Sequence, residues 1–333
     1  MACTCCALCF HPSQPSRIDA VAEFLQQLPQ QLVNGLALGA IYALIALGYT
    51  MVYGVLRFIN FAHGDVFMLG AFAGYFLAPM VNRFLSAQSY LGAALVLVLA
   101  MAICAGIGML LEFLAYRPLR NRPKLIVLIT AIGVSLFIEY TCQHKAVFGA
   151  APRSFPDLIP AGSWKIDGFW KLGGFVVGSS QVLVFVTTLL LLIALTFIVQ
   201  KTKVGTAMRA VSFNEKAAAL MGINVNFIIS FTFGLGSALA AAGGILYAMS
   251  YASIDPLMGV QTGLKAFIAA VLGGIGSLPG AALGGVLLGL VETAAGGIPA
   301  ISPYRDGIAF AILILILLFK PAGLLGKSQV EKV

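Results

Sequence analysis

Polar side chains that interrupt otherwise apolar stretches are the residues of this sequence that could do chemistry. Three of them, Asn60, His63 and Asp65, lie in the run FINFAHGD at 58–65. Such a break either lines a water-filled path between membrane helices or forms a turn in which Asn60 or Asp65 caps the next helix. The first interpretation makes these three residues candidates for a translocation path.

Carboxylates within apolar runs are a second set of candidates, because a charge inside a membrane is costly and usually functional. They are Asp65, Glu112, Glu139 and Glu292. Glu112 lies five residues before Arg117 and is expected to pair with basic loop residues. Glu292 follows the glycine-rich run GGVLLGLVE. We interpret it either as a member of a structural pair or as a transport residue, and a carrier driven by protons or ions would depend on it.

Enzymatic motifs are weak in this sequence. The tail PAGLLGKS has Pro321 where a phosphate-binding loop needs its first glycine, and only five residues follow Ser328. We therefore expect the chain to bind no nucleotide and to hydrolyse no ATP. Ser135 with His63 is the one pairing that an intramembrane hydrolase could use, and we interpret Ser135 as a small packing residue instead. No metal site or other cofactor is expected.

Composition assigns the chain to the membrane. Of its 333 residues, 60% are hydrophobic and 10% are charged, whereas soluble domains are about 25% charged. The net charge of +8 resides in short loops between apolar runs, which argues against nucleic-acid binding. We predict an all-α polytopic membrane protein with eight or nine transmembrane helices. The candidate spans are 31–55, 62–81, 91–115, 125–142, 180–200, 225–250, 263–276, 280–296 and 305–320.

Basic residues indicate the orientation. They gather in the loops after the third and fifth spans and in the C-terminal tail, which share one side if nine spans are counted. That side is predicted to be cytoplasmic by the positive-inside rule. The segment 143–179, which carries Trp164 and Trp170, becomes a long external loop. Residues 1–24 are predicted to be a disordered extension of a membrane domain at 25–333.

A soluble-looking segment at 201–224 is predicted to lie on the cytoplasmic side. Residues 206–221 are expected to form one short amphipathic helix that Gly222 ends. Its apolar stripe would contain Ala207, Val211, Ala218, Leu220 and Met221, and its wet face Arg209, Asn214, Glu215 and Lys216. This pattern is typical of a docking element, although an ordinary interfacial connector remains open.

A glycine-rich run at 272–289, LGGIGSLPGAALGGVLLG, must break in the middle because of its proline. Its glycines, spaced four residues apart, favour close helix crossing. The run either lines a pathway, with Gly274 and Ser277 as candidates, or serves tight packing.

Several segments together carry a resemblance to a known family. Lys216-Ala217-Ala218-x-x-x-Gly222 is similar to the E-A-A-x-x-x-G pattern of the coupling loop in permeases of ATP-driven importers, with Lys in place of Glu. More specifically, YGVLRFINFAHGD at 53–65, KAFIAAVLGGIGSLPGA at 265–281 and KPAGLLGK at 320–327 resemble the permease of high-affinity leucine/isoleucine/valine importers. The resemblance covers about residues 25–333.

This resemblance implies a subunit of a multi-component importer in the bacterial inner membrane. The partners would be a second homologous permease, two ATPase subunits that bind ATP and Mg²⁺, and a periplasmic substrate-binding protein. The segment with Glu215, Lys216, Ala217, Ala218 and Gly222 would dock on the ATPase. Branched-chain amino acids are the implied substrates, and permeases of urea, amide and other amino-acid importers are similar alternatives.

Overall fold

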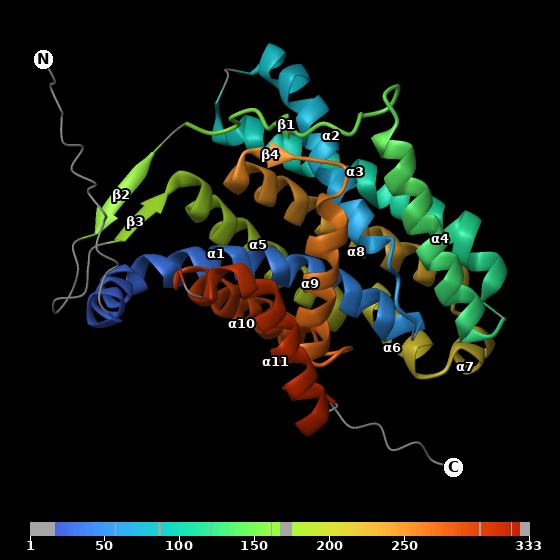
Figure 1. The fold of residues 1–333 in the computed structure, drawn as a ribbon. Helices are drawn as coiled ribbons and strands as arrows, with labels where there is room; N and C mark the ends of the chain where they lie inside the picture. The colour runs from blue at the N-terminus through green and yellow to red at the C-terminus, as the bar shows by residue number, and fades with distance from the viewer. Residues whose placement is uncertain are drawn as a thin grey trace, which may run out of the picture.

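The fold is described from a computed structural model, which describes residues 17–56, 58–85, 88–120, 122–160, 162–166, 175–299, 301–320 and 322–326. This part of the chain is predominantly helical (Figure 1). The helices are α1 (Arg17–Leu56), α2 (His63–Phe84), α3 (Tyr90–Leu111), α4 (Lys124–Gln143), α5 (Ser179–Lys201), α6 (Lys203–Phe213), α7 (Glu215–Leu220), α8 (Val225–Tyr251), α9 (Met258–Gly273), α10 (Leu278–Gly296) and α11 (Arg305–Phe319).

Four short strands add to the all-α pattern predicted from the sequence. Strand β1 (Arg153–Ser154) pairs antiparallel with β4 (Ser253–Ile254), and β2 (Ser163–Ile166) pairs antiparallel with β3 (Phe175–Gly178). Three of the four lie in the segment between α4 and α5, which was predicted to be the external loop. The residue Trp170 of that loop lies outside the described residues.

The membrane spans agree with the predicted number. Within the described residues, eight helices are long and apolar enough to cross a membrane, and α9 is a shorter apolar helix. A predicted span at 263–276 corresponds to α9, which begins at Met258 and ends at Gly273. Helix α1 already begins at Arg17, inside the segment 1–24 that the sequence predicted to be disordered. Residues 1–16 lie outside the described part.

Local side chains define several helix ends. Ser89, Asn224 and Ser277 are the N-cap residues of α3, α8 and α10, and each side-chain oxygen accepts a hydrogen bond from a backbone N–H of the first turn. Gly274 ends α9 with φ of +104°, a conformation that glycine adopts without steric cost. The α9–α10 connection therefore breaks at the place that the sequence indicated.

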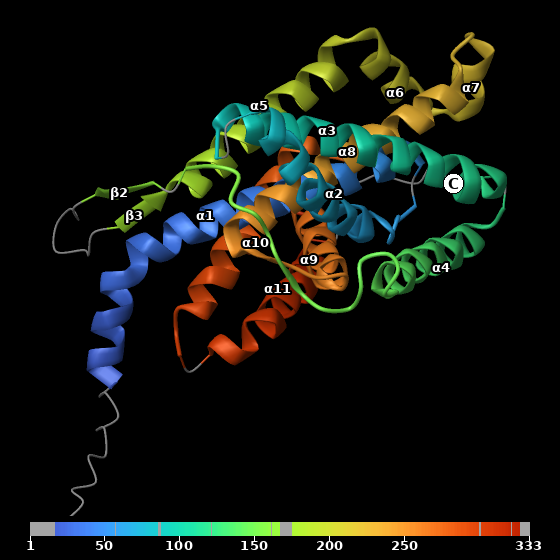
Figure 2. The ribbon, with the colours of Figure 1, turned by 90° about the horizontal axis from the view of Figure 1, so that it is seen from above.

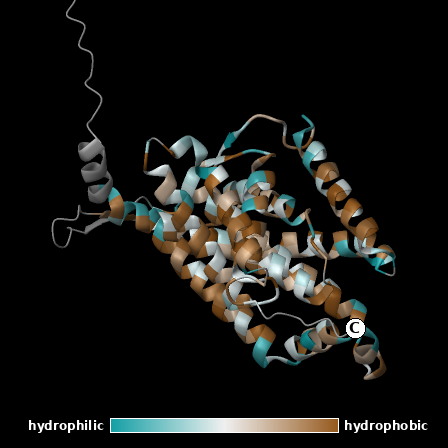
Figure 3. Ribbon diagram, turned by 60° about the horizontal axis from the view of Figure 1, so that its bottom comes forward, coloured by the Kyte–Doolittle hydropathy of each residue, from teal (hydrophilic) through white to brown (hydrophobic). Residues whose placement is uncertain are grey.

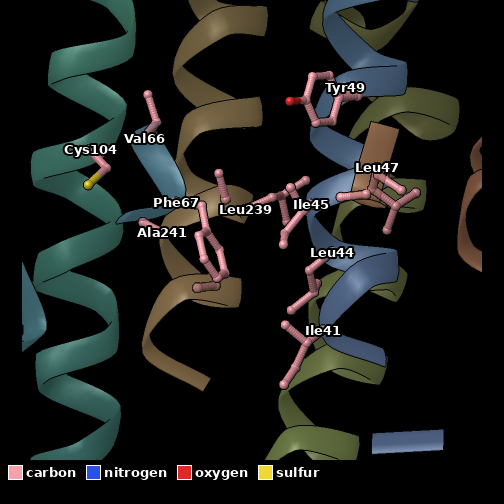
Figure 4. Packing of buried hydrophobic residues seen from close by; sticks show 14 of the residues in the cluster. Ile41, Leu44, Ile45, Leu47, Tyr49, Val66, Phe67, Cys104, Leu239 and Ala241 are labelled. Carbon is pink, nitrogen blue, oxygen red and sulfur yellow. The ribbon is translucent and has the colours of Figure 1, made fainter. Parts of the chain in front are cut away.

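The core lies between α1, α2, α3 and α8. Ile45 of α1, Phe67 of α2 and Leu239 of α8 are buried members of this core, and Figure 4 labels all three. Glycines let these backbones approach closely. A Cβ atom built on Gly70 of α2 would lie 2.3 Å from the Cα atom of Ala241 in α8. Small residues at helix crossings replace the hydrophobic driving force that lipid does not supply.

Peripheral helices surround this core. Most of the α1 span is buried, whereas α5 and α11 expose nearly all of theirs. Figure 3 shows the helices hydrophobic along much of their length, as lipid-facing helices must be. The β2–β3 hairpin and the α6–α7 pair lie at opposite ends of the bundle (Figures 1 and 2). With the predicted orientation, the first end is external and the second is cytoplasmic.

Candidate functional site

The break between α1 and α2 places Asn60 inside the bundle. Helix α1 ends at Leu56 and α2 begins at His63. The Asn60 residue is 5% exposed, and its side-chain oxygen accepts a hydrogen bond of 2.6 Å from the Tyr116 hydroxyl. Ala62 is the N-cap residue of α2, and no side chain caps the helix there. The capping role that the sequence left open for Asn60 or Asp65 is therefore wrong, because both side chains bond to other helices.

His63 and Asp65 are buried in the first turn of α2, at 1% and 2% exposure. The His63 ring packs edge-on against Tyr49, with 4.5 Å between the ring centroids. Its Nε2 atom has no hydrogen-bond partner within the described part of the chain. Asp65 accepts a hydrogen bond of 2.5 Å from the Ser135 hydroxyl of α4. Ser135 thus joins two helices by a polar contact, beyond the packing role predicted for it.

A small crevice opens beside Asp65. Its volume is about 190 Å³, and residues of α1, α2, α4 and α9 line it. Apolar side chains such as Ile132, Leu264 and Phe267 form most of its wall, and Asp65 and Glu139 are its acidic members. The structure thus brings Asp65 to an opening between helices, whereas Asn60 lies on the side of α3.

Glu292 lies in a buried charged cluster at a different place. Its carboxylate accepts hydrogen bonds from the Tyr42 hydroxyl at 2.9 Å and from Lys265 Nζ at 2.7 Å. Lys265 Nζ also lies 2.8 Å from Asp306 Oδ1 at the beginning of α11. Four helices, α1, α9, α10 and α11, therefore meet at Lys265. Glu292 therefore belongs to a structural ion pair, which was one of the two roles predicted for it.

The Glu292 cluster borders a large polar cleft of about 720 Å³. Its lining comes from the N-terminal half of the α1 span, strand β3, the first halves of α5, α9 and α11, and the ends of α8 and α10. All of these positions are on the external side in the predicted orientation. The lining residues are Gln30, Gln31, Asn34, Ala37, Leu38, Ile41, Tyr42, Val176, Gly178, Ser180, Gln181, Tyr247, Ser250, Tyr251, Gln261, Thr262, Lys265, Glu292, Thr293, Gly296 and Arg305.

Gly274 and Ser277 are not part of this cleft. They form the turn between α9 and α10, at the opposite end of α10 from Glu292. The C-terminal segment covers the turn, because Leu324 and Leu325 donate backbone hydrogen bonds to the carbonyls of Leu272 and Gly273. Gly274 and Ser277, two of the predicted path residues, therefore lie in a turn covered by the C-terminal segment, at the end of the bundle that is predicted to be cytoplasmic.

Most glycines of 272–289 lie at close contacts with neighbouring backbone, as expected for packing, one of the two uses left open. A Cβ atom on Gly285 would lie 2.4 Å from the backbone nitrogen of Ala43 in α1, and one on Gly284 would lie 2.1 Å from the carbonyl oxygen of Ala269 in α9. Helix α10 thus packs closely against α1 and α9 at these glycines.

The predicted single helix at 206–221 is two helices, α6 and α7. Asn214 separates them, and its side chain caps α7 by accepting a hydrogen bond from the Ala217 N–H. Because of this break, the residues of α7 do not continue the apolar face of α6. Val211 and Ala218 are buried as predicted, but Leu220 and Met221 are 88% and 84% exposed. The predicted stripe is therefore wrong in its last turn. Gly222 follows α7 at φ of +84°.

Glu112 pairs as the sequence predicted. Its carboxylate forms an ion pair with Arg120 of the following basic loop, and it also accepts a hydrogen bond from the Ser230 hydroxyl of α8. Arg120 donates a further hydrogen bond of 2.7 Å to Asn226. These contacts attach the end of α3 to the beginning of α8.

Comparisons with known proteins place this architecture in a family. Residues 31–317 match the family described as "Branched-chain amino acid transport system / permease component". The chain belongs to this permease family. It is 43% identical over 304 residues to the "High-affinity branched-chain amino acid transport system permease protein BraD" of Pseudomonas aeruginosa, and the match covers 91% of this permease and 97% of BraD.

Two further relatives extend the comparison. The permease is 40% identical over 311 residues to the "High-affinity branched-chain amino acid transport system permease protein LivH" of Escherichia coli K12, covering 93% and 99% of the two chains. It is 30% identical over 295 residues to a probable LivH of Methanocaldococcus jannaschii, covering 85% and 88%. The resemblance read from the sequence segments is thereby confirmed.

Sequence reasoning missed the partners of the acidic residues in the permease. It considered carboxylates within spans but not Lys265, the basic residue within the predicted span 263–276. Because a charge in a membrane helix needs an opposite charge nearby, Lys265 was the available signal for a partner of Glu292. Tyr42 and Tyr116 gave no such signal, since tyrosines also pack as ordinary large side chains.

Proposed function

We propose that this permease forms the translocation path of an ATP-binding-cassette importer for branched-chain amino acids, together with a second homologous permease subunit. Two ATPase subunits bind ATP and Mg²⁺ and drive the path between outward-open and inward-open states. A periplasmic substrate-binding protein delivers the amino acid. The complex lies in the bacterial inner membrane, and the permease itself catalyses no covalent chemistry.

The observation that carries this proposal is the identity of 43% to BraD and 40% to LivH along nearly the whole chain. Both relatives are described as permease proteins of high-affinity branched-chain amino acid transport systems. Membrane-spanning helices in the structure support a multi-pass permease. Because the match extends over both the spans and the loops between them, we infer the same substrate class for this chain.

The segment α6–α7 is the proposed contact with the ATPase. Phe213, Leu220 and Met221 are 89%, 88% and 84% exposed, and all three are large apolar side chains outside the spans. Exposed apolar groups of this kind mark interaction sites. We infer that they enter a groove of the ATPase, while Glu215, Lys216 and Ala217 face its rim. Ala218 packs inward and Gly222 turns the chain toward α8.

The coupling segment also touches the break that contains Asn60. The Ser212 hydroxyl of α6 donates a hydrogen bond to the carbonyl of Gly54 in the last turns of α1. A displacement of α6 would therefore act on the end of α1 and on the buried residues Asn60, His63 and Asp65 that follow it. We propose that these three residues move with the ATPase cycle, that Glu292 lines the external part of the path, and that Gly274 and Ser277 hinge its cytoplasmic end.

The test is uptake by the complete importer, reconstituted in proteoliposomes with its ATPase and binding protein. Radiolabelled leucine, isoleucine and valine should enter in an ATP-dependent manner, and urea and short amides should not. Replacement of Phe213 by Ser should abolish uptake and release the ATPase subunits from the purified complex. Leu91, also exposed, lies at the opposite end of α3 from the cytoplasm, and Leu91→Ser is the control that should retain the ATPase.

Uptake of leucine by the purified permease alone, driven by an ion gradient without ATPase, would overturn the proposal. It would favour an ion-coupled carrier, and Glu292→Gln should then stop transport. ATP-dependent uptake of urea in place of amino acids would keep the importer but replace its substrate class.

A further inference from the structure

The external cleft is lined by charges of both signs, Lys265, Glu292 and Arg305, and Asp306 contacts Lys265 from outside this lining. Lys265 Nζ lies 2.7 Å from Glu292 Oε1 and 2.8 Å from Asp306 Oδ1. Lys265 and Glu292 are 8% and 5% exposed, so both are held within protein. Arg305 lies beside them at the rim, with its Nε atom 3.8 Å from Asp306 Oδ1 and its side chain 56% exposed.

The charge arrangement in this cluster is asymmetric. In their usual charged forms, Lys265 is flanked by two carboxylates, so the inner part carries one excess negative charge. Arg305 supplies the compensating positive charge at the exposed rim. A cation that enters the cleft is therefore favoured next to Glu292, and an anion is favoured next to Arg305. The donor fork of a guanidinium also suits a carboxylate better than a lysine ammonium does.

The remaining lining suits a small apolar group with a polar end. Leu38 and Ile41 of α1 and the rings of Tyr247 and Tyr251 of α8 supply apolar surface next to the charges. Gln30, Asn34 and Gln181 form a hydrogen-bonded group at the other side of the cleft, which supports its wall. The volume of about 720 Å³ lies within the range of about 300–1,000 Å³ that small-molecule sites occupy.

We propose that this cleft is a binding site for a zwitterionic amino acid. The ammonium group of the ligand lies against the carboxylate of Glu292, its carboxylate lies against the guanidinium of Arg305, and its side chain contacts the α1 and α8 surface. This inference rests on the proposed function and specifies where the permease receives its substrate. The site binds weakly, because Lys265 already satisfies part of the acidic charge.

The experiment uses the two permease subunits with their ATPase subunits in lipid nanodiscs, and the binding protein is left out. Ligand binding is measured by saturation-transfer difference NMR, which detects weak ligands. The probes are leucine, leucinamide, which lacks the carboxylate, and 4-methylpentanoate, which lacks the ammonium group. Leucine should bind, leucinamide should bind more weakly, and 4-methylpentanoate should give no signal. A hydrogen bond to a charged group contributes about a tenfold difference in Kd. Arg305→Gln should therefore weaken the binding of leucine about tenfold, so that leucine and leucinamide bind with equal affinity.

Arg83→Gln is the matched control, because Arg83 is an exposed arginine in the last turn of α2, outside the cleft. Glu292→Gln should weaken the binding of leucine and of leucinamide by the same factor. If this buried change prevents assembly of the complex, the exposed Arg305→Gln variant still decides the matter. Equal binding of leucine by Arg305→Gln and wild type, or binding of 4-methylpentanoate as strong as that of leucine, would overturn the site.

The same preparations separate this proposal from the proposed function. ATP-driven leucine uptake by a wild-type importer that gives no leucine signal in nanodiscs would reject the cleft and leave the importer. Leucine binding that responds to Arg305→Gln, without ATP-driven uptake in proteoliposomes, would support the cleft and reject the importer.

Discussion

The Ser135 hydroxyl of α4 donates a hydrogen bond to the buried carboxylate of Asp65 in α2. This contact joins a peripheral helix to the first turn of a central one. Among the described side chains of α4, those of Val127, Ala131 and Cys142 are buried. Apolar packing of α4 is therefore limited, and the polar contact is a substantial part of its attachment.

Ser135→Ala should loosen α4. A side-chain hydrogen bond between membrane helices contributes on average about 0.6 kcal/mol, and this substitution also leaves a buried carboxylate without its hydroxyl donor. Cys142, buried near the end of α4, reports the movement. We expect maleimide labelling of Cys142 to become several times faster in the variant, measured in membranes after Cys3, Cys5, Cys6 and Cys9 are replaced by serine.

The control for α4 is Cys104, which is buried in α3 and should label at the same slow rate in both proteins. Thr130→Val is a matched loss of a hydroxyl on α4, because Thr130 donates only to the Ile126 carbonyl of its own helix. If Thr130→Val accelerates labelling of Cys142 as much as Ser135→Ala does, the contact with Asp65 does not hold α4.

The close approach of α10 to α1 gives a second prediction. Gly285→Ala would place a methyl group 2.4 Å from the backbone nitrogen of Ala43 and 2.5 Å from its Cα atom. Backbone atoms cannot yield as a flexible side chain does, and overpacking costs about 1–3 kcal/mol. The melting temperature of the detergent-purified complex, followed by size-exclusion fluorescence, should fall. Gly106→Ala in α3 meets no atom within 4 Å, and its melting temperature should be unchanged or slightly higher. An equal fall in both variants would contradict the packing role of Gly285.

Sequence reasoning recovered the membrane class, the approximate spans and the pairing of Glu112 with a basic loop residue. Composition and the spacing of apolar runs determine these features, because lipid tolerates only helices with satisfied backbones or closed barrels. The break at 58–62 was also visible as polar residues in an apolar region. The permease family was recognised from three sequence segments that resemble those of known permeases, and the periodicity of apolar residues did not contribute.

Contacts between distant helices could not be predicted in the same way. Asn60 bonds to Tyr116 and Asp65 to Ser135, and each pair joins segments more than fifty residues apart. A single helix spacing cannot reveal which face of α3 or α4 meets α2. The break at Asn214 was missed because the apolar pattern of 206–221 continues across it. Asn214 itself was the signal, since this residue favours helix N-caps over helix interiors.

The Lys265–Glu292 pair yields a third prediction, which concerns stability and is asymmetric. Lys265→Met leaves Glu292 buried, and among the described residues Tyr42 is then its one remaining hydrogen-bond donor. Removal of one partner of a buried ion pair typically costs about 3–5 kcal/mol. Glu292→Gln costs less, because Lys265 keeps its contact with Asp306. We expect the melting temperature of the purified complex to be lower with Lys265→Met than with Glu292→Gln.

The double variant Lys265→Met with Glu292→Gln completes the cycle. It removes both charges and should be more stable than Lys265→Met alone, since no uncompensated carboxylate remains at position 292. Additive effects of the two substitutions would show that the pair is not coupled, and the ion pair would then contribute nothing to the attachment of α9 and α10.

Gly222 gives the last prediction, which separates backbone conformation from contact with a partner. Its φ is +84°, and a Cβ atom placed on it would meet nothing within 4 Å. Within this chain, only the backbone therefore demands glycine. Asparagine tolerates the left-handed region, whereas a β-branched residue is an outlier there. Gly222→Asn should retain most ATP-dependent leucine uptake in proteoliposomes, and Gly222→Val should lose most of it. If Gly222→Asn loses uptake as fully as Gly222→Val while both variants assemble in the membrane, the backbone is not the limiting factor. We then infer that the docked ATPase fills the space beside Gly222, because no atom of the described residues lies within 4 Å of a Cβ atom there.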